Sequence, residues 1–136
     1  MDESRMRRIY TINWQLTMVT LILTGISILL AFVFHGFIFR WLVAPEYRDI
    51  SWLLPGMVLA GGLFATGQFA SLYLMSENKS MSLIGPKVVT AVAGVLLNVA
   101  GARLYGIAGV VAAIVTFSGL YFLWIYFLAR GRQKAV

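Results

Sequence analysis

The sequence predicts an all-α membrane protein with four transmembrane helices, the last two of which form a tight antiparallel hairpin. Its 136 residues are 60% hydrophobic and only 12% charged, whereas soluble domains are about one half apolar and about one quarter charged. The apolar residues gather in long runs, each near the roughly 20 residues that cross a hydrocarbon core. Lysines and arginines stand near the ends of these runs. We therefore expect a single transmembrane domain with helices at about 12–39, 53–75, 83–102 and 105–128.

The first predicted helix, 12–39, follows a short basic lead and is longer than the apolar core of a signal peptide. Small and polar residues recur along it at spacings of three or four, which places them on one face. That face has two interpretations: a seam where helices pack closely, or the wall of a solvated transport cavity. Its members are Asn13, Thr17, Thr20, Thr24, Ser27, Ala31 and His35.

Residues 40–52 are expected to form a loop, because Pro45 interrupts a helix and charged residues follow it. The next helix, 53–75, is rich in glycine and alanine, which allow other backbones to approach closely. Gln68 is the strongly polar residue inside it. We interpret Gln68 as an interhelical hydrogen-bonding group, with a ligand contact as the alternative.

The helices at 83–102 and 105–128 are separated only by Gly101 to Leu104, and so short a connection makes them antiparallel neighbours. We expect Asn98 to form a hydrogen bond between helices. The basic residues from Arg130 to Lys134 are expected to form a mobile tail. The two facing seams are predicted to consist of Gly94, Asn98 and Gly101 on one helix and Gly109, Ala112, Thr116 and Gly119 on the other.

Orientation follows from the basic residues, because loops rich in lysine and arginine stay in the cytoplasm. Four helices place both termini on one side, which then holds eight of the 11 lysines and arginines. Arg40, Arg48 and Arg103 are the three on the other side. We therefore expect both termini in the cytoplasm and a multi-pass protein of the cell inner membrane.

Little in the sequence is suited to catalysis. Cysteine is absent, and one histidine and five acidic residues form no paired carboxylates, no catalytic triad and no metal-ligand spacing. His35 lies close to the membrane interface, where we interpret it as a hydrated side chain. The net charge of +6 sits at helix ends and tails, which is the pattern of membrane topology and not of nucleic-acid binding. We predict no enzymatic activity, no cofactor, no metal and no nucleic-acid partner.

One resemblance to a known family stands beside these inferences. Asn98, the run Tyr105-Gly106-Ile107-Ala108-Gly109-Val110-Val111-Ala112-Ala113 and the apolar helix and basic tail after it resemble the carboxyl-terminal half of polysaccharide flippases. These flippases belong to the multidrug/oligosaccharidyl-lipid/polysaccharide exporter superfamily. The segments Phe39–Tyr47 and Ser76–Ser80 resemble two loops of the same family. Members usually have twelve or more helices, so the resemblance implies the carboxyl-terminal portion of a larger transporter.

The resemblance implies a part in moving lipid-linked oligosaccharide across the membrane for the synthesis of cell-surface polysaccharide, lipopolysaccharide included. The expected partners are membrane lipid, the lipid-linked oligosaccharide and the remaining helices of the transporter. The alternative is a stand-alone four-helix protein that acts as a homo-oligomer, either as a transporter or as an assembly subunit. The candidate residues that line a pathway or pack helices are Asn13, Thr17, Thr20, Thr24, Ser27, Gln68 and Asn98.

Overall fold

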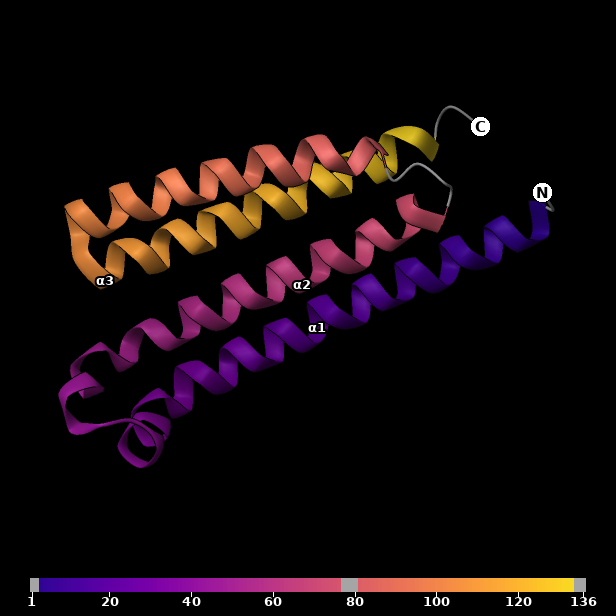
Figure 1. The fold of residues 1–136 in the computed structure, drawn as a ribbon. Coiled ribbons are helices and arrows are strands. Elements are labelled where there is room, and N and C mark those ends of the chain that lie inside the picture. Colours follow the sequence, from indigo (N-terminus) through magenta and orange to yellow (C-terminus); the bar gives the residue numbers. More distant parts are fainter. Residues whose placement is uncertain (1–2, 77–80, 134–136) are drawn as a thin grey trace.

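A computed structural model describes residues 3–76 and 81–133. All regular structure in this part of the chain is helical, so the predicted all-α class is confirmed. Within these described residues, three segments are long and apolar enough to cross a membrane, namely Arg7–Leu42, Pro45–Leu72 and Leu83–Arg130. The elements, in chain order, are α1 (Glu3–Leu42), the 3-10 helix η1 (Pro45–Leu53), α2 (Leu54–Ser76) and α3 (Met81–Gln133) (Figure 1).

The first helix is longer at both ends than the sequence predicted. α1 begins at Glu3 and not near residue 12, because the basic lead contains no glycine or proline to interrupt it. Its polar first turns continue the helix beyond the apolar run, and the Thr11 hydroxyl donates to the carbonyl of Arg7 at 2.9 Å.

The predicted loop at 40–52 is mostly helical, which corrects the expectation. α1 continues to Leu42, and η1 begins at Pro45. Proline is tolerated in the first turn of a helix, where its missing N–H has no partner to lose. Pro45 therefore ends α1 but also starts the next helix. Arg48 donates from Nη2 to the carbonyl of Arg40 at 3.3 Å, which links η1 to the end of α1.

α3 reverses its direction at Gly106, which has φ 61° and ψ −138°. We name residues 81–105 the first arm of α3 and residues 107–133 the second arm. Figure 1 shows the two arms side by side, with the reversal at the end far from the termini. The hairpin is present, but its turn was misplaced: Gly101 to Leu104 remain helical, and Gly101 contacts Gly109 of the second arm instead of turning the chain.

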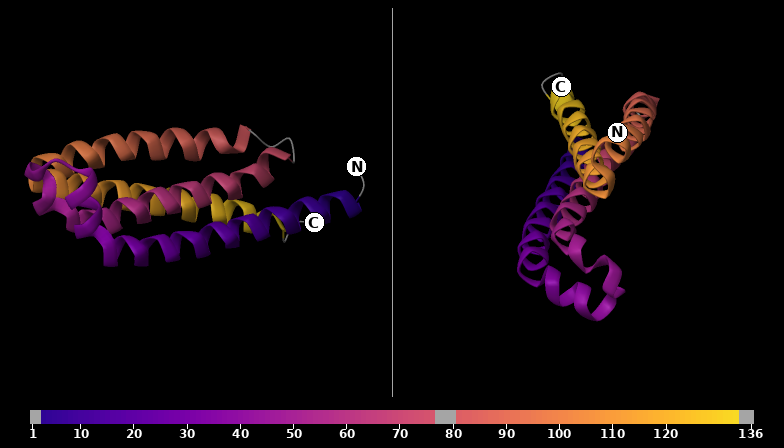
Figure 2. Two further views of the ribbon diagram at one scale, coloured as in Figure 1. Left: turned by 90° about the horizontal axis from the view of Figure 1, so that it is seen from below. Right: turned by 90° about the vertical axis from the view of Figure 1, so that its left-hand side faces the viewer.

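The helices lie in a row in the order α1, α2, second arm, first arm. α2 packs against α1 on one side and α3 on the other (Figure 2). The Phe64 ring of α2 stacks on Phe117 at 5.9 Å and contacts Tyr121 at 5.2 Å, both in the second arm. The first arm then packs on the far side of the second, where a Cβ on Gly94 would meet Phe117.

The seam predicted for the second arm is only partly right. Gly109 does contact the first arm, at Gly101. Thr116 is exposed, and a Cβ on Gly119 would meet nothing within 4 Å. Phe117 takes their place, because an aromatic ring reaches the space that Gly94 leaves free. The basic tail is also corrected, since Arg130 to Gln133 continue α3.

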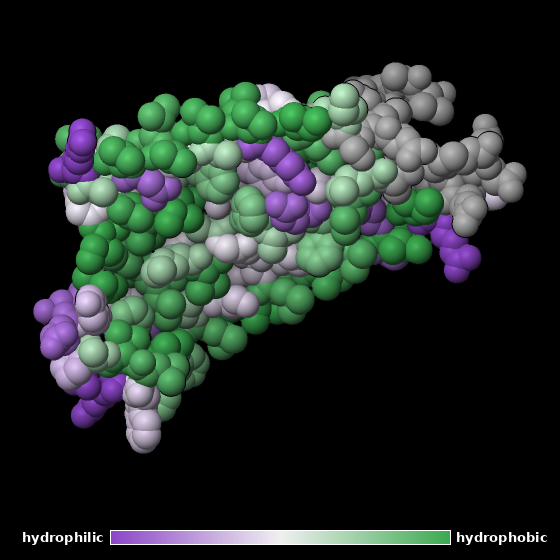
Figure 3. Space-filling model, viewed as in Figure 1, coloured by the Kyte–Doolittle hydropathy of each residue, from purple (hydrophilic) through white to green (hydrophobic). Residues whose placement is uncertain are grey.

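Hydrophobic side chains cover much of the outer surface (Figure 3). The outer faces of the row are the most apolar, with Phe32 and Val33 of α1 each 70% exposed and Leu96 of the first arm 66% exposed. A small buried cluster joins the last turns of α2 to α3. It consists of Ala70, Leu74, Leu83, Tyr121 and Ile125.

Candidate functional site

The polar face of α1 is turned towards α2. Thr17 is 1% exposed and Thr24 is 8% exposed. Thr24 fills the space beside Gly62 of α2, where a Cβ on the glycine would overlap the threonine side chain. These contacts are those of a close-packed seam between α1 and α2.

The three threonine hydroxyl groups of this face form hydrogen bonds within α1 itself. Thr17 donates to the carbonyl of Asn13 at 2.9 Å, Thr20 to that of Leu16 at 2.8 Å, and Thr24 to that of Thr20 at 2.7 Å. A threonine that donates to a carbonyl one turn earlier needs no partner outside its helix. The middle of the face therefore offers little to a passing polar solute.

Ser27 lies away from the seam. Its side chain is exposed, and it borders an apolar groove of about 490 Å³ between α1 and the start of α2. The other lining residues are all hydrophobic. They are Leu30, Ala31, Phe34, Phe37, Ile38, Leu54 and Val58.

Gln68 and Asn98 lie in different parts of the row. Gln68, in α2, is half-buried, and its backbone carbonyl accepts a hydrogen bond from the Ser71 hydroxyl at 2.7 Å. Asn98 is half-buried in the first arm of α3, and its Nδ2 donates to the carbonyl of Gly94 at 2.8 Å. This bond lies within one arm, where we expected a bond between helices. The structure therefore does not bring the seven candidate residues together in one site.

His35, near the end of α1, contacts η1. Its Nδ1 lies 3.1 Å from the Ser51 hydroxyl, so the end of α1 is linked to η1 by a side-chain hydrogen bond. Neither residue is fully buried.

A hollow with polar lining residues lies between the start of α1 and the end of α3. It has a volume of about 260 Å³. We name it the terminal pocket. One wall comes from α1, the other from the second arm of α3, and Ala70 of α2 is the floor. Its lining residues are Tyr10, Asn13, Trp14, Thr17, Ala70, Tyr126, Ala129 and Arg130.

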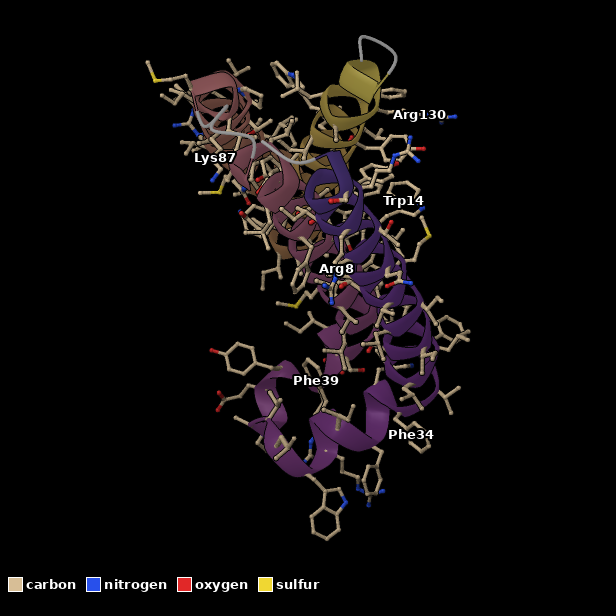
Figure 4. All side chains as sticks on the ribbon, turned by 90° about the vertical axis from the view of Figure 1, so that its right-hand side faces the viewer. Arg8, Trp14, Phe34, Phe39, Lys87 and Arg130 are labelled. Atoms are coloured by element: carbon tan, nitrogen blue, oxygen red, sulfur yellow. The ribbon has the colours of Figure 1, made fainter. Side chains whose placement is uncertain are left out.

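Arg130 and Tyr126 organise one wall of this pocket. They are four residues apart, so both project from the same face of α3. Arg130 donates from Nη1 to the Tyr126 hydroxyl at 3.0 Å, and its guanidinium lies 5.9 Å from the centre of that ring. The ring of Trp14 approaches Tyr126 from α1 at 5.9 Å. Figure 4 shows Trp14 and Arg130 on the same side of the molecule, with Lys87 on the opposite side.

The terminal pocket thus combines one cation, two aromatic rings in contact and an amide. Asn13 is half-buried there, and its amide can both donate and accept hydrogen bonds. Such a set is suited to an anionic group that accepts hydrogen bonds. Comparison with protein-family models, with curated proteins and with solved structures finds no match to this chain. Within the described residues, no group of histidines and carboxylates is placed to hold a metal ion.

Sequence reasoning identified Asn13 and Thr17 but missed Trp14, Tyr126 and Arg130. It assigned Arg130 to a mobile tail. A signal was present, because Tyr10 and Trp14, Asn13 and Thr17, and Tyr126 and Arg130 are all pairs spaced by four residues. That spacing predicts shared faces. The spacing does not show that the α1 face and the α3 face lie opposite each other in the folded chain.

Proposed function

We propose that this chain contributes four membrane spans to a transporter that moves lipid-linked oligosaccharide across the inner membrane for cell-surface polysaccharide synthesis. The resemblance of Tyr105 to Ala113 and its surroundings to polysaccharide flippases supports the substrate class. The structural observation that carries the proposal is the open row of helices. α1 and the first arm of α3 lie at its two edges and leave wide apolar faces uncovered.

The reversal of α3 at Gly106 supports the count of four spans. Each arm contains over twenty residues, about the length that crosses a hydrocarbon core. With two spans in α3, the start of α1 and the end of α3 share one side of the membrane, as they share one end of the molecule in Figure 1. The excess of basic residues on that side favours the cytoplasm.

The packing of α1 supports a role as part of a larger assembly. A path for a large anionic substrate should be hydrated and should attract negative charge. In this chain the polar face of α1 is closed against α2 at Thr17 and Thr24. The described charged residues stand towards helix ends or in η1, as Arg40, Arg48 and Arg103 do. We therefore propose that further helices complete the substrate path.

A second candidate rests on the same uncovered faces. Copies of this chain could cover one another and act as a homo-oligomeric transporter or assembly subunit. In that case chemical cross-linking in native membranes, with cysteines introduced at Val95 or Leu96, should link two copies of this chain. The leading proposal expects these positions to be cross-linked to other helices of the transporter.

The transport proposal is tested in liposomes that contain a polyprenyl-diphosphate-linked oligosaccharide. The purified chain alone is expected to leave the substrate in its original leaflet. The chain produced together with the further helices of the proposed transporter is expected to move the substrate, as measured by the accessibility of the substrate to an external oligosaccharide-cleaving enzyme. Transport by the chain alone would support the homo-oligomer instead. Absence of transport by both would contradict the proposed function.

A further inference from the structure

We propose that the terminal pocket binds the headgroup phosphate of an anionic membrane phospholipid, with Arg130 as the phosphate-binding residue. The site would hold a resident lipid at the edge of the protein. This proposal does not depend on the transport proposal, because a four-span protein of any function could retain such a lipid.

Arg130 supplies the positive charge of the terminal pocket. Its contacts among the described residues are with the hydroxyl and the ring of Tyr126. A guanidinium has five N–H donors in a planar fork, so most of them stay available. Phosphate oxygens accept such donors in pairs, which makes arginine the preferred partner of phosphate groups.

Further hydrogen-bonding groups line the pocket together with Arg130. Asn13 on α1 presents a half-buried amide, one turn before the buried Thr17. The Tyr126 hydroxyl accepts from Arg130 and still has its own proton to donate. A phosphate in the hollow can therefore contact donors from both α1 and α3, which holds it more firmly than a single surface arginine would.

The surroundings of the pocket favour a lipid headgroup over a free phosphate ion. The pocket lies where the apolar helices end, and Trp14 and Tyr126 have the amphipathic rings that prefer the headgroup level. Exposed apolar side chains continue from its rim along both walls, with Met18 one turn beyond Trp14 and Leu123 one turn before Tyr126. An acyl chain can lie along them, whereas a free ion would gain nothing from them. Basic pockets between spanning helices are a known form of headgroup site.

The experiment measures which lipid lies beside Trp14. Trp41, Trp52 and Trp124 are replaced by Phe, so that Trp14 is the one remaining reporter. The protein is reconstituted in phosphatidylcholine vesicles with increasing amounts of phosphatidylglycerol. In one set of samples the phosphatidylcholine is brominated near the headgroup end of its acyl chain, and in a parallel set the phosphatidylglycerol is. Bromine quenches the fluorescence of a nearby tryptophan. We expect several-fold preferential quenching by the brominated phosphatidylglycerol.

The variants test whether the preference comes from the pocket. Arg130→Gln should abolish it. Arg8→Gln removes the same charge at the same end but outside the pocket lining, and it should leave the preference unchanged. Asn13→Leu keeps every charge and should weaken the preference, so the test stands even if Arg130→Gln does not fold.

Three outcomes would overturn the proposal. One is equal quenching by the two lipids in the parent protein. Another is an equal loss of preference in Arg8→Gln and Arg130→Gln, which would indicate general surface attraction. The third is full displacement of the lipid by inorganic phosphate at unchanged ionic strength, which would assign the pocket to a free anion.

Discussion

Gly101 and Gly109 are in direct backbone contact across the reversal of α3. A Cβ placed on either residue would overlap the carbonyl group of the other. The two arms can therefore approach only because both positions lack a side chain. This contact fixes how far apart the arms lie at the closed end of the hairpin.

Substitution of Gly109 should destabilise the hairpin. In Gly109→Ala the new methyl group meets the Gly101 backbone and the Tyr105 Cβ, and overpacking of this kind costs about 1–3 kcal/mol. Gly119→Ala, in the same arm, is the control, since its Cβ would meet nothing within 4 Å. Thermal unfolding in detergent should show a lower midpoint for Gly109→Ala than for Gly119→Ala. Equal midpoints would mean that the arms are not in contact at this position.

Gly106 should tolerate substitution poorly for a different reason. No atom lies within 4 Å of its added Cβ, but its φ of 61° is strained for a residue with a side chain. Gly106→Ala should therefore lose about 1–3 kcal/mol of stability through the backbone alone. Gly25→Ala, at an exposed and ordinary helical position of α1, should be neutral or gain up to about 1 kcal/mol. Chemical unfolding of the two variants in detergent measures the difference, and a neutral Gly106→Ala would contradict the reversal at this residue.

The α1–α2 seam can be tested by a double-mutant cycle between Thr24 and Gly62. Gly62→Ala should destabilise the protein, because its Cβ overlaps the Thr24 side chain. Thr24→Ala removes the two overlapping side-chain atoms beyond Cβ, so the double variant should recover part of the loss. We expect a coupling energy of about 0.5–3 kcal/mol, as for residues in contact. Strictly additive effects would mean that the polar face of α1 lies away from α2 and is free to line a cavity.

The sequence predicted the all-α class with apolar spanning segments correctly, because long apolar runs reflect the membrane itself. It placed the turn of the hairpin a few residues too early, since Gly101, Gly106 and Gly109 are all able to turn a chain. The choice among them depends on tertiary contact. Gly101 and Gly109 lie where the two helical arms contact each other, and Gly106 between them adopts the positive φ that reverses the chain.

The terminal pocket was less predictable for a similar reason. The spacing of Tyr126 and Arg130 shows that they share a face, but nothing local shows that Trp14 of α1 lies opposite. Ala70 of α2, a small residue, also lines the hollow. Such a site depends on three helices at once, and each helix alone has an ordinary amphipathic end.

We propose that this chain crosses the membrane four times with both ends in the cytoplasm. The most direct test is cysteine labelling in intact cells with a reagent that cannot cross the membrane. Cysteines at Glu46 and Arg103, in η1 and beside the reversal of α3, should react from outside, whereas a cysteine at Arg7 or Arg130 should react only after permeabilisation. Labelling of Arg130→Cys from outside, or protection of Arg103→Cys until the cells are opened, would contradict the four-span account.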